Sequence, residues 1–378
     1  MSPTYPINQP PPLTAYTPPG GTTSTHHHFI SHYIWSLVKH IDYFDNFLKE
    51  TVNLSKFNLD TLEGRVESIY SALKGDDDLG PRIIKKLPQG SWAQETIISP
   101  QNGKPFDADF LLQMKENPDW SDDVKQYINA VYKVLDNHSD YGAMPHNRKC
   151  RCVYVEYANN KMHVDIVPYV ISADGQQVIV NRDDNEWEKT DPSGFTKWMK
   201  TKDELADRNL RKVIRLLKFL RDHKDSFTGT KSILITTLLG NQVTEERKIA
   251  DPGYYSDLPT ALFHIVSDLN DWLQQYPDKP SIADPSGSGV TFDHRWTQET
   301  YSYFRDRIKV HAVEIRTAYE ETNPEASVAK WQDLFGDKFQ APTPPSSSSK
   351  FSDAAVTGNA SGYGVENTPS SGRSGRAG

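Results

Sequence analysis

The feature that most constrains this chain is the segment Phe106-Asp107-Ala108-Asp109-Phe110, in which aspartates alternate with apolar residues. Successive side chains of a β-strand point to opposite faces of a sheet. Asp107 and Asp109 therefore share one face, while their apolar neighbours share the other. The segment predicts a strand that is buried on one face and presents a pair of carboxylates on the other.

A third aspartate has a similar setting later in the chain. Asp165 lies between apolar neighbours in the run 162–171, which we predict to be another strand. Three carboxylates on one sheet face repel each other, and hard divalent cations with oxygen ligands relieve that repulsion. We therefore expect Asp107, Asp109 and Asp165 to be catalytic and to bind two Mg²⁺ ions, with Mn²⁺ as an alternative metal.

A glycine and a serine precede the first carboxylate pair. The tripeptide Gln89-Gly90-Ser91 follows a short β-type run at 83–87. Glycine lets the backbone approach a ligand closely, and a serine that opens a helix offers its hydroxyl and free N–H groups to phosphate oxygens. Gln89, Gly90 and Ser91 are therefore predicted to contact a nucleoside triphosphate.

The remaining patterns predict a sheet followed by a helical region. Apolar residues recur at three- and four-residue steps between residues 29 and 73, which indicates two amphipathic helices. Short β-type runs follow, and the last two read as a hairpin that turns at 158–161. The predicted strands are 83–87, 106–114, 150–157 and 162–171. The later predicted helices are 205–224, 232–243, 260–276 and 296–319.

Composition sets the outer limits of the folded part. Residues 1–28 are rich in proline and threonine, and residues 341–378 are of low complexity, so both segments are predicted to be disordered. Between them we expect a catalytic lobe over 29–200 and a helical lobe over 201–340.

The net charge and the cysteine content limit the kinds of partner and metal that we expect for this chain. The formal net charge of -8 at pH 7 gives no broad basic surface, so we expect no stable nucleic-acid partner. Cys150 and Cys152, placed on a predicted strand with no second pair, offer no zinc site and fit a reduced cytoplasmic setting. No apolar run reaches the roughly 18 residues that span a membrane, so no membrane partner is expected.

One basic stretch stands out in this acidic chain. Residues 208–231 hold eight basic residues against two acidic ones, which suits a polyanionic ligand. In the predicted helix, Val213 and Leu217 would pack inward and leave Lys218 near the rim of a cleft. A solvated basic helix face is the alternative interpretation.

The Gly-Ser step, the paired strand aspartates and the third aspartate together make the chain similar to polymerase-beta-like nucleotidyltransferases. Within them it resembles the bacterial relatives of cyclic GMP-AMP synthase and oligoadenylate synthetase, from about residue 29 to residue 339. The resemblance implies an α+β, bilobed fold, with a nucleotidyltransferase sheet flanked by helices and a helical second lobe. It also implies that Lys218 and Ser232 bind the triphosphate. One departure is Gln94-Glu95, where related enzymes often have a glycine.

The resemblance implies an activity as well. Such enzymes join nucleoside triphosphates into a cyclic di- or trinucleotide second messenger with release of pyrophosphate, and a downstream effector of anti-phage defence senses the product. Some relatives are linked through the C-terminus to other molecules by a ubiquitin-activating-like ligase, which makes Gly378 a candidate conjugation site; a dispensable linker end is the alternative.

Two other functions stay open at this point. The chain could be a nucleotidyltransferase that acts on RNA, a protein or a small molecule, or an inactive relative that binds nucleotides. The three intact aspartates speak against an inactive site, because clustered charge costs stability and serves no purpose there.

Overall fold

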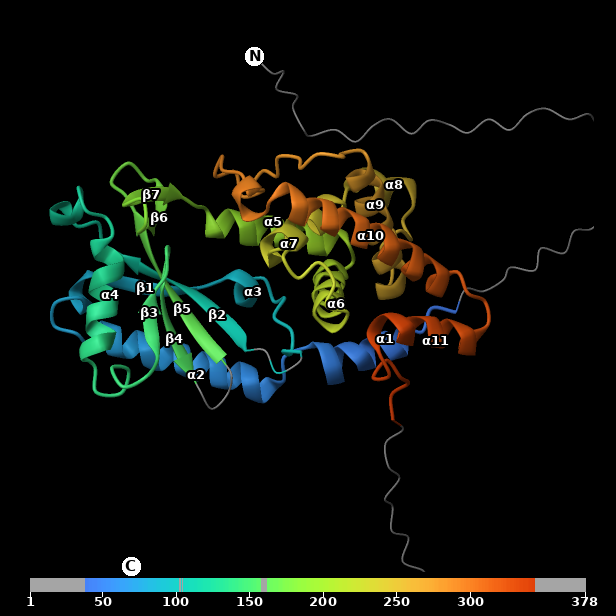
Figure 1. Ribbon diagram of the computed structural model, residues 1–378, viewed down its shortest axis with the longest axis horizontal. Helices are drawn as coiled ribbons and strands as arrows, with labels where there is room; N and C mark the ends of the chain where they lie inside the picture. Colours follow the sequence, from blue (N-terminus) through green and yellow to red (C-terminus); the bar gives the residue numbers. More distant parts are fainter. Residues whose placement is uncertain (1–37, 102, 104, 158–161, 344–378) are drawn as a thin grey trace, which may run out of the picture.

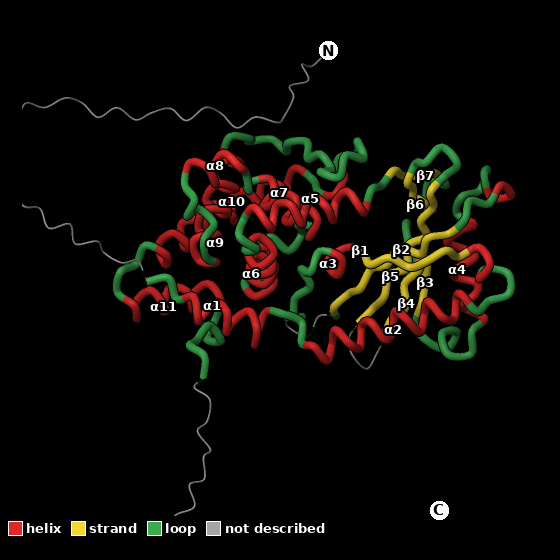
Figure 2. Tube along the Cα trace, turned by 180° about the vertical axis from the view of Figure 1, so that it is seen from behind, coloured by secondary structure: helices red, strands yellow, loops and turns green. Residues whose placement is uncertain are grey.

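The computed structural model describes residues 38–101, 103, 105–157 and 162–343. Figure 1 shows a β-sheet with its covering helices at one end of this part of the chain and a group of helices at the other. Figure 2 shows the same two lobes from behind, with the strands in yellow and the helices in red. The predicted α+β, bilobed architecture is confirmed. The predictions for residues 1–28, for most of 341–378 and for Gly378 lie outside the described residues.

Seven strands in the described part of the chain form one mixed sheet. The strand order is β1-β2-β5-β4-β3, and β6 pairs with both β5 and β7. β2 and β5 run parallel, whereas every other pair is antiparallel. The strands are β1 Ile83–Gln89, β2 Phe106–Met114, β3 His146–Arg148, β4 Val153–Tyr157, β5 Met162–Ile171, β6 Gln177–Asn181 and β7 Glu186–Lys189.

The strands with the clearest alternation were placed correctly from the sequence. β2 and β5 have the predicted bounds, and β1 continues two residues past the predicted end, to Gln89. Phe106, Ala108 and Phe110 are buried, as the alternation required. The turn predicted at 158–161 lies outside the described residues, although β4 and β5 are antiparallel neighbours on either side of it.

The strand predicted at 150–157 begins only at Val153, so the prediction that Cys150 and Cys152 lie on a strand was wrong. The backbone N–H of Lys149 donates to the carbonyl of Cys152 at 2.8 Å, which closes a turn before the strand. Both thiols are free; Cys152 is buried and Cys150 is half-buried.

Two helices, α2 (Lys56–Lys74) and α4 (Gln126–Asn137), share one hydrophobic core with a face of the sheet. α2 begins after Ser55, whose side chain accepts a hydrogen bond from the N–H of Asn58 and so caps the helix. Apolar residues at three- and four-residue steps fill the interface with the sheet. In α2 they are Leu62, Val66, Ile69 and Leu73, and in α4 they are Tyr127, Ile128, Val131 and Leu135.

The second lobe is helical, and it shares a second hydrophobic core. Its helices are α1 Ile41–Phe47, continued by a π-turn at Leu48–Val52, then α5 Pro192–Leu205, α6 Leu210–His223, α7 Ser232–Asn241, α8 Glu245–Ala250, α9 Leu258–Gln274, α10 Gln298–Tyr319 and α11 Pro324–Phe335. Among the described helices, none is both long and apolar enough to cross a membrane.

The first helix packs with the helical lobe, although the sheet follows it in sequence. Phe44 and Phe47 of α1 are fully buried. Phe44 meets the ring of Trp331 at 5.0 Å between centroids, and Phe47 meets Phe335 at 5.5 Å. α5 also buries Phe195 in this core. The boundary at residue 200 stays a prediction; the chain enters the helical core twice, before and after the sheet.

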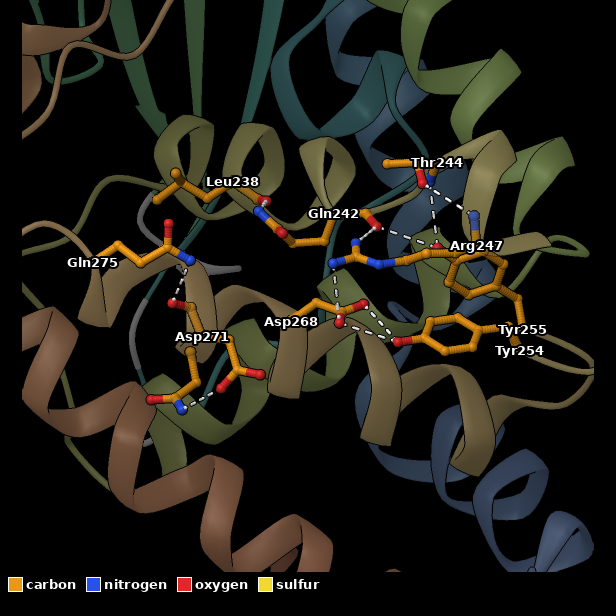
Figure 3. A network of polar contacts seen from close by, with 10 residues as sticks. Leu238, Gln242, Thr244, Arg247, Tyr254, Tyr255, Asp268, Asp271 and Gln275 are labelled. Atoms are coloured by element: carbon orange, nitrogen blue, oxygen red, sulfur yellow. Dashed lines mark hydrogen bonds and ion pairs between the residues drawn. The ribbon is translucent and has the colours of Figure 1, made fainter. Parts of the chain in front are cut away.

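A polar network ties α8 to α9 (Figure 3). Arg247 of α8 contacts Asp268 of α9, with Nη2 3.1 Å from Oδ1. The hydroxyl of Tyr254 donates to both oxygens of Asp268, at 3.0 and 3.1 Å. Tyr255 and Arg247 both donate to the carbonyl of Gln242 at the end of α7. Burial raises the pKa of Asp268 to about 6, although Arg247 and the Tyr254 hydroxyl favour the ionised form.

This network predicts that Tyr254→Phe destabilises the protein and that the loss of stability depends on pH. The variant leaves the buried carboxylate of Asp268 with one donor fewer, so the free energy of unfolding should fall by about 1–2 kcal/mol at pH 7.5. Because the hydroxyl favours the ionised carboxylate, the loss should shrink below pH 6, where Asp268 is protonated in the folded state. Urea unfolding at both pH values tests this. Tyr303→Phe, at an exposed position of α10, is the control; an equal loss in both variants would contradict the prediction.

Candidate active site

The strand register brings two of the predicted aspartates side by side. The parallel pairing of β2 and β5 sets Asp109 opposite Asp165 and Asp107 opposite His163. On its other edge, β2 pairs with β1, where Gln89 lies opposite Asp109. Asp109 therefore lies in the centre of the predicted site, between the end of β1 and the third aspartate.

Asp109 is the most strongly perturbed acid of this group. Burial raises the pKa of its carboxyl to about 8, and the charges of Asp107 and Asp165 add to the effect. Lys149 and Lys218 act in the opposite direction. The predicted repulsion between the carboxylates is therefore present in the fold, where the charges of Asp107 and Asp165 raise the pKa of Asp109.

Any residue other than glycine would be strained at position 90. Its φ of +60° is in the left-handed region, and a Cβ there would lie 2.4 Å from Oδ2 of Asp109. Gly90 opens the one-turn helix α3 (Gly90–Ala93), which also contains Ser91. The side-chain carbonyl of Gln89, just before it, is buried with no hydrogen-bond partner. The tripeptide thus forms a tight turn against the central carboxylate.

Lys149 is a site residue that the sequence analysis missed. Its Nζ lies 3.0 Å from each carboxylate oxygen of Asp165 and 4.6 Å from the ring centroid of Tyr154. Burial works against its charge, but the hydrogen bonds to Asp165 hold the pKa of Lys149 above its ordinary value. The residue lies in the turn between β3 and β4, where no periodicity singles it out.

The helical lobe supplies cations to the same place. Lys218 of α6 is 4% exposed, so the prediction of a rim position was wrong. Its Nζ donates to the carbonyl of Thr96 at 2.9 Å and to the Thr96 hydroxyl at 3.2 Å. Burial, together with the charge of the neighbouring Arg221, lowers the pKa of Lys218 to about 8, against the attraction of Asp107. Arg221 in turn donates to the hydroxyl of Ser232 at 3.3 Å.

One cavity of about 970 Å³ between the two lobes contains these residues. All the predicted site residues in the described part of the chain line it, namely Gln89, Gly90, Ser91, Asp107, Asp109, Asp165, Lys218 and Ser232. Charged lining residues that the sequence analysis did not single out include Lys149, Arg151, Glu188, Arg221, Asp222 and Arg295. Arg221 could have been found, because it follows Lys218 by three residues on the same helix face.

The far wall of the cavity is also charged. Arg151 donates from Nη2 to Oε1 of Glu188 at 2.6 Å, and Asn181 donates to the same oxygen at 2.8 Å. The pKa of Arg295 is lowered, mainly by burial and in addition by repulsion from the nearby charge of Arg151. At this end of the cavity Arg151 is therefore hydrogen-bonded to Glu188, and Arg295 lies close enough for the charge of Glu188 to favour its ionised form.

The donor set fits Mg²⁺ in its chemistry. In the ranges that the structure describes, no three His, Cys, Asp or Glu side chains are arranged to hold a metal ion as they stand. The three aspartates nevertheless present hard oxygen donors on one sheet face, which is what Mg²⁺ prefers. Asp109 is crowded by like charges, and Lys149 contributes a positive charge at Asp165. The arrangement favours a cation next to Asp109.

The raised pKa of Asp109 predicts a stability change in metal-free protein. The folded state binds a proton up to about pH 8, whereas the unfolded chain releases it near pH 4, so stability falls as pH rises through this window. Asp109→Asn has no ionisable group at this position, so its stability should not fall in this way as the pH rises. In EDTA at pH 8 its Tm should exceed that of the wild type by about 2–4 °C, and the difference should shrink towards pH 5. Differential scanning calorimetry measures it. Asp107→Asn, at an exposed position of the same strand, should change less; a lower Tm for Asp109→Asn at pH 8 would contradict the argument.

Comparison with known proteins identifies the domain. Residues 38–203 match the family model described as the Second Messenger Oligonucleotide or Dinucleotide Synthetase domain. The chain is 22% identical over 295 residues to a cyclic AMP-AMP-AMP synthase from an Acinetobacter species, with 76% of this chain and 81% of that protein covered. A cyclic AMP-AMP-AMP synthase from Escherichia coli is 22% identical over 330 residues, covering 80% of this chain and 99% of that protein.

Solved structures share the fold. The E. coli MS115-1 CdnC structure with ATP matches with a TM-score of 0.61 at 22% identity, covering 79% of this chain and 98% of that one. The Vibrio cholerae DncV cyclic AMP-GMP synthase with a linear intermediate also matches with a TM-score of 0.61, at 15% identity, covering 79% of this chain and 96% of that one. The resemblance predicted from the sequence is confirmed for the domain: residues 38–203 match the model of the second-messenger oligonucleotide or dinucleotide synthetases, and the solved CdnC and DncV structures share the fold.

Proposed function

We propose that this protein is a metal-dependent nucleotidyltransferase that joins nucleoside triphosphates into a cyclic di- or trinucleotide second messenger for anti-phage defence. The observation that carries the proposal is the distribution of charge in the cavity. Three aspartates lie on the sheet side, and Lys218 and Arg221 lie on the α6 side. A metal ion and a triphosphate need this pair of opposite environments.

The residues divide into two groups. Asp107, Asp109 and Asp165 would hold two Mg²⁺ ions, or Mn²⁺ as the alternative, which supply Lewis acidity for the displacement of pyrophosphate when bound. Gln89, Gly90 and Ser91, at the end of β1, would contact the triphosphate from the sheet side. Lys218 and Ser232 would contact it from the helical side. The buried side-chain carbonyl of Gln89, which has no hydrogen-bond partner among the described residues, would accept from a donor group of the nucleotide, such as a sugar hydroxyl.

The acceptor is proposed to be a second nucleotide. The cavity volume of about 970 Å³ is near the upper end of the roughly 300–1,000 Å³ typical of small-molecule sites, which leaves room beyond one nucleotide. On the far wall, Arg151 and Arg295 would offer guanidinium groups to a second phosphorylated group, beside the carboxylates of Glu188, Asp191 and Asp284. The net charge of -8 does not favour RNA as a partner.

Partners outside the catalytic cavity stay predictions. E. coli MS115-1 CdnC has been solved in complex with HORMA-deltaN. For this chain, an effector that senses the product and a ubiquitin-activating-like ligase that conjugates Gly378 are proposals. So is its cytoplasmic location.

One assay separates the candidate functions. The purified protein is incubated with four labelled nucleoside triphosphates and Mg²⁺, and phosphatase-resistant products are separated. A small resistant product supports the synthase. Label that appears only on added RNA, protein or small molecule supports the alternative transferase, and nucleotide binding with no product supports an inactive relative.

Asp107→Asn should reduce synthesis by about a thousandfold or more, because it removes a charge proposed to hold the metal ions. The variant should fold normally, since Asp107 is exposed. Initial rates with Mg²⁺ provide the measurement, with Asp60→Asn on the exposed face of α2 as a control that should keep full activity. Turnover near that of the wild type in Asp107→Asn would reject the proposed metal site.

Lys218→Ala should chiefly raise the KM for triphosphate, by about tenfold, because a lysine that grips phosphates stabilises substrate and transition state alike. Rates at saturating and at low nucleotide separate KM from kcat. Lys212→Ala removes a charge from the same helix at a residue that donates to Asn209 and does not line the cavity. If Lys218→Ala behaves like this control at both nucleotide levels, Lys218 has no part in binding.

A further inference from the structure

Three basic residues on one face of α6 reach across to the sheet lobe. Arg211, Arg215 and Lys218 follow each other at steps of four and three residues, so they form a row along the helix. Each donates to a backbone carbonyl of the segment 94–96, in the same order and at 2.9 Å in each case. We call these three residues the basic row.

The same segment is bonded on its other side to the Gly-Ser turn. The N–H groups of residues 94, 95 and 96 donate to the carbonyls of Gly90, Trp92 and Ser91, at 3.2, 3.1 and 2.8 Å. Each of the three residues therefore has its N–H bonded to the turn and its carbonyl bonded to α6. Gln94 and Thr96 are buried, so water does not readily replace the bonds at these two residues, whereas the bond from Arg215 to the Glu95 carbonyl is exposed.

The basic row is fixed to the helical lobe. α6 buries Val213, Ile214 and Leu217 in the helical core. Asp203, at the end of α5, is 4% exposed and accepts from the backbone N–H and from Nη1 of Arg211, at 2.9 and 2.8 Å. A shift of α6 against the sheet would therefore change the position of residues 94–96 and, through them, of Gly90 and Ser91.

We infer that the basic row is a positioning device that sets the Gly90-Ser91 turn for triphosphate binding, and that Arg211 and Arg215 are positioning residues. The inference rests on the proposed function, because it assigns the turn to the triphosphate. Arg211 and Arg215 act through the backbone of residues 94–96, and neither lines the cavity.

The acceptors in this device are backbone carbonyls, although the Thr96 hydroxyl also accepts from Lys218 and the Gln94 amide donates to the hydroxyl of Thr196. Glu95 has a left-handed φ of 57° and an exposed side chain. A non-glycine residue pays a conformational cost in this region. The bond from Arg215 to the Glu95 carbonyl holds the backbone there.

Arg215→Met tests the inference, because methionine keeps the apolar stem and removes the donor to residue 95. Hydrogen exchange of the amides at 90–96 should become faster. The Kd for an ATP analogue with a methylene between the α and β phosphorus atoms, measured with Mg²⁺, should rise about tenfold, the usual loss for a hydrogen bond to a charged group. Arg215→Lys, which keeps a charged donor, should recover part of the affinity.

Two control variants separate positioning from charge. Glu95→Gln keeps the carbonyl and removes the side-chain charge near Arg215, and Lys212→Met removes a cation of α6 that does not contact the segment. Both should leave exchange and affinity within about twofold of the wild type. If Glu95→Gln reproduces the Arg215→Met result, the interaction is a charge pair between side chains and the inference is wrong.

The other possible outcomes of these experiments also test the inference or the proposed function. Faster exchange at 90–96 with an unchanged Kd would make the row purely structural and overturn the inference, as would unchanged exchange. If the wild type binds the analogue but makes no cyclic product, the proposed function fails while the Kd still tests the row. If the wild type binds no nucleotide, the assignment of the turn to a triphosphate fails together with the inference, and this is distinct from a failure of Arg215 alone.

Discussion

The crowding of three carboxylates around Asp109 is the constraint on which the rest of this site depends. A carboxyl whose pKa is raised to about 8 by burial and by Asp107 and Asp165 destabilises the ionised site at neutral pH. Compensation has to come from cations. The chain supplies Lys149 from a turn beside the sheet and Lys218 from α6, and the proposed metal ions would supply the rest. Cations from both lobes are therefore needed to stabilise the ionised carboxylates on this sheet face.

The path of the chain keeps the two lobes in contact. α1 packs in the helical core, α2 packs on the sheet, and the chain returns to the helical core at α5. Just before α2, Asn53 bridges to Ile98, and the hydroxyl of Ser99 donates to the carbonyl of Asn53 at 2.8 Å. The segment after the Gly-Ser turn is thus attached to the crossing point of the chain as well as to α6.

Sequence reasoning predicted those parts in which one residue pattern determines one local structure. The alternation in 106–114 and 162–171 fixed both strands, since a slip of one residue would bury the aspartates. Shorter pieces failed for a physical reason: β3, β6 and β7 are three to five residues long, too short to show a clear alternation, and each depends on pairing with the strand next to it in the chain. α4 was overlooked although Tyr127, Val131 and Leu135 carried a helical period. The turn that holds Lys149 has no period at all, and its role depends on a contact 16 residues away.

Glu95 belongs to the pair Gln94-Glu95, where the resemblance leads one to expect a glycine, and its backbone has a left-handed φ that favours glycine. In the structure α6 holds this segment through backbone carbonyls, which every residue provides. The side chains of Gln94 and Thr96 make further hydrogen bonds, to Thr196 and Lys218, whereas the side chain of Glu95 is exposed. A motif comparison sees the missing glycine but not Arg211 and Arg215, more than a hundred residues later, which hold the same backbone in place.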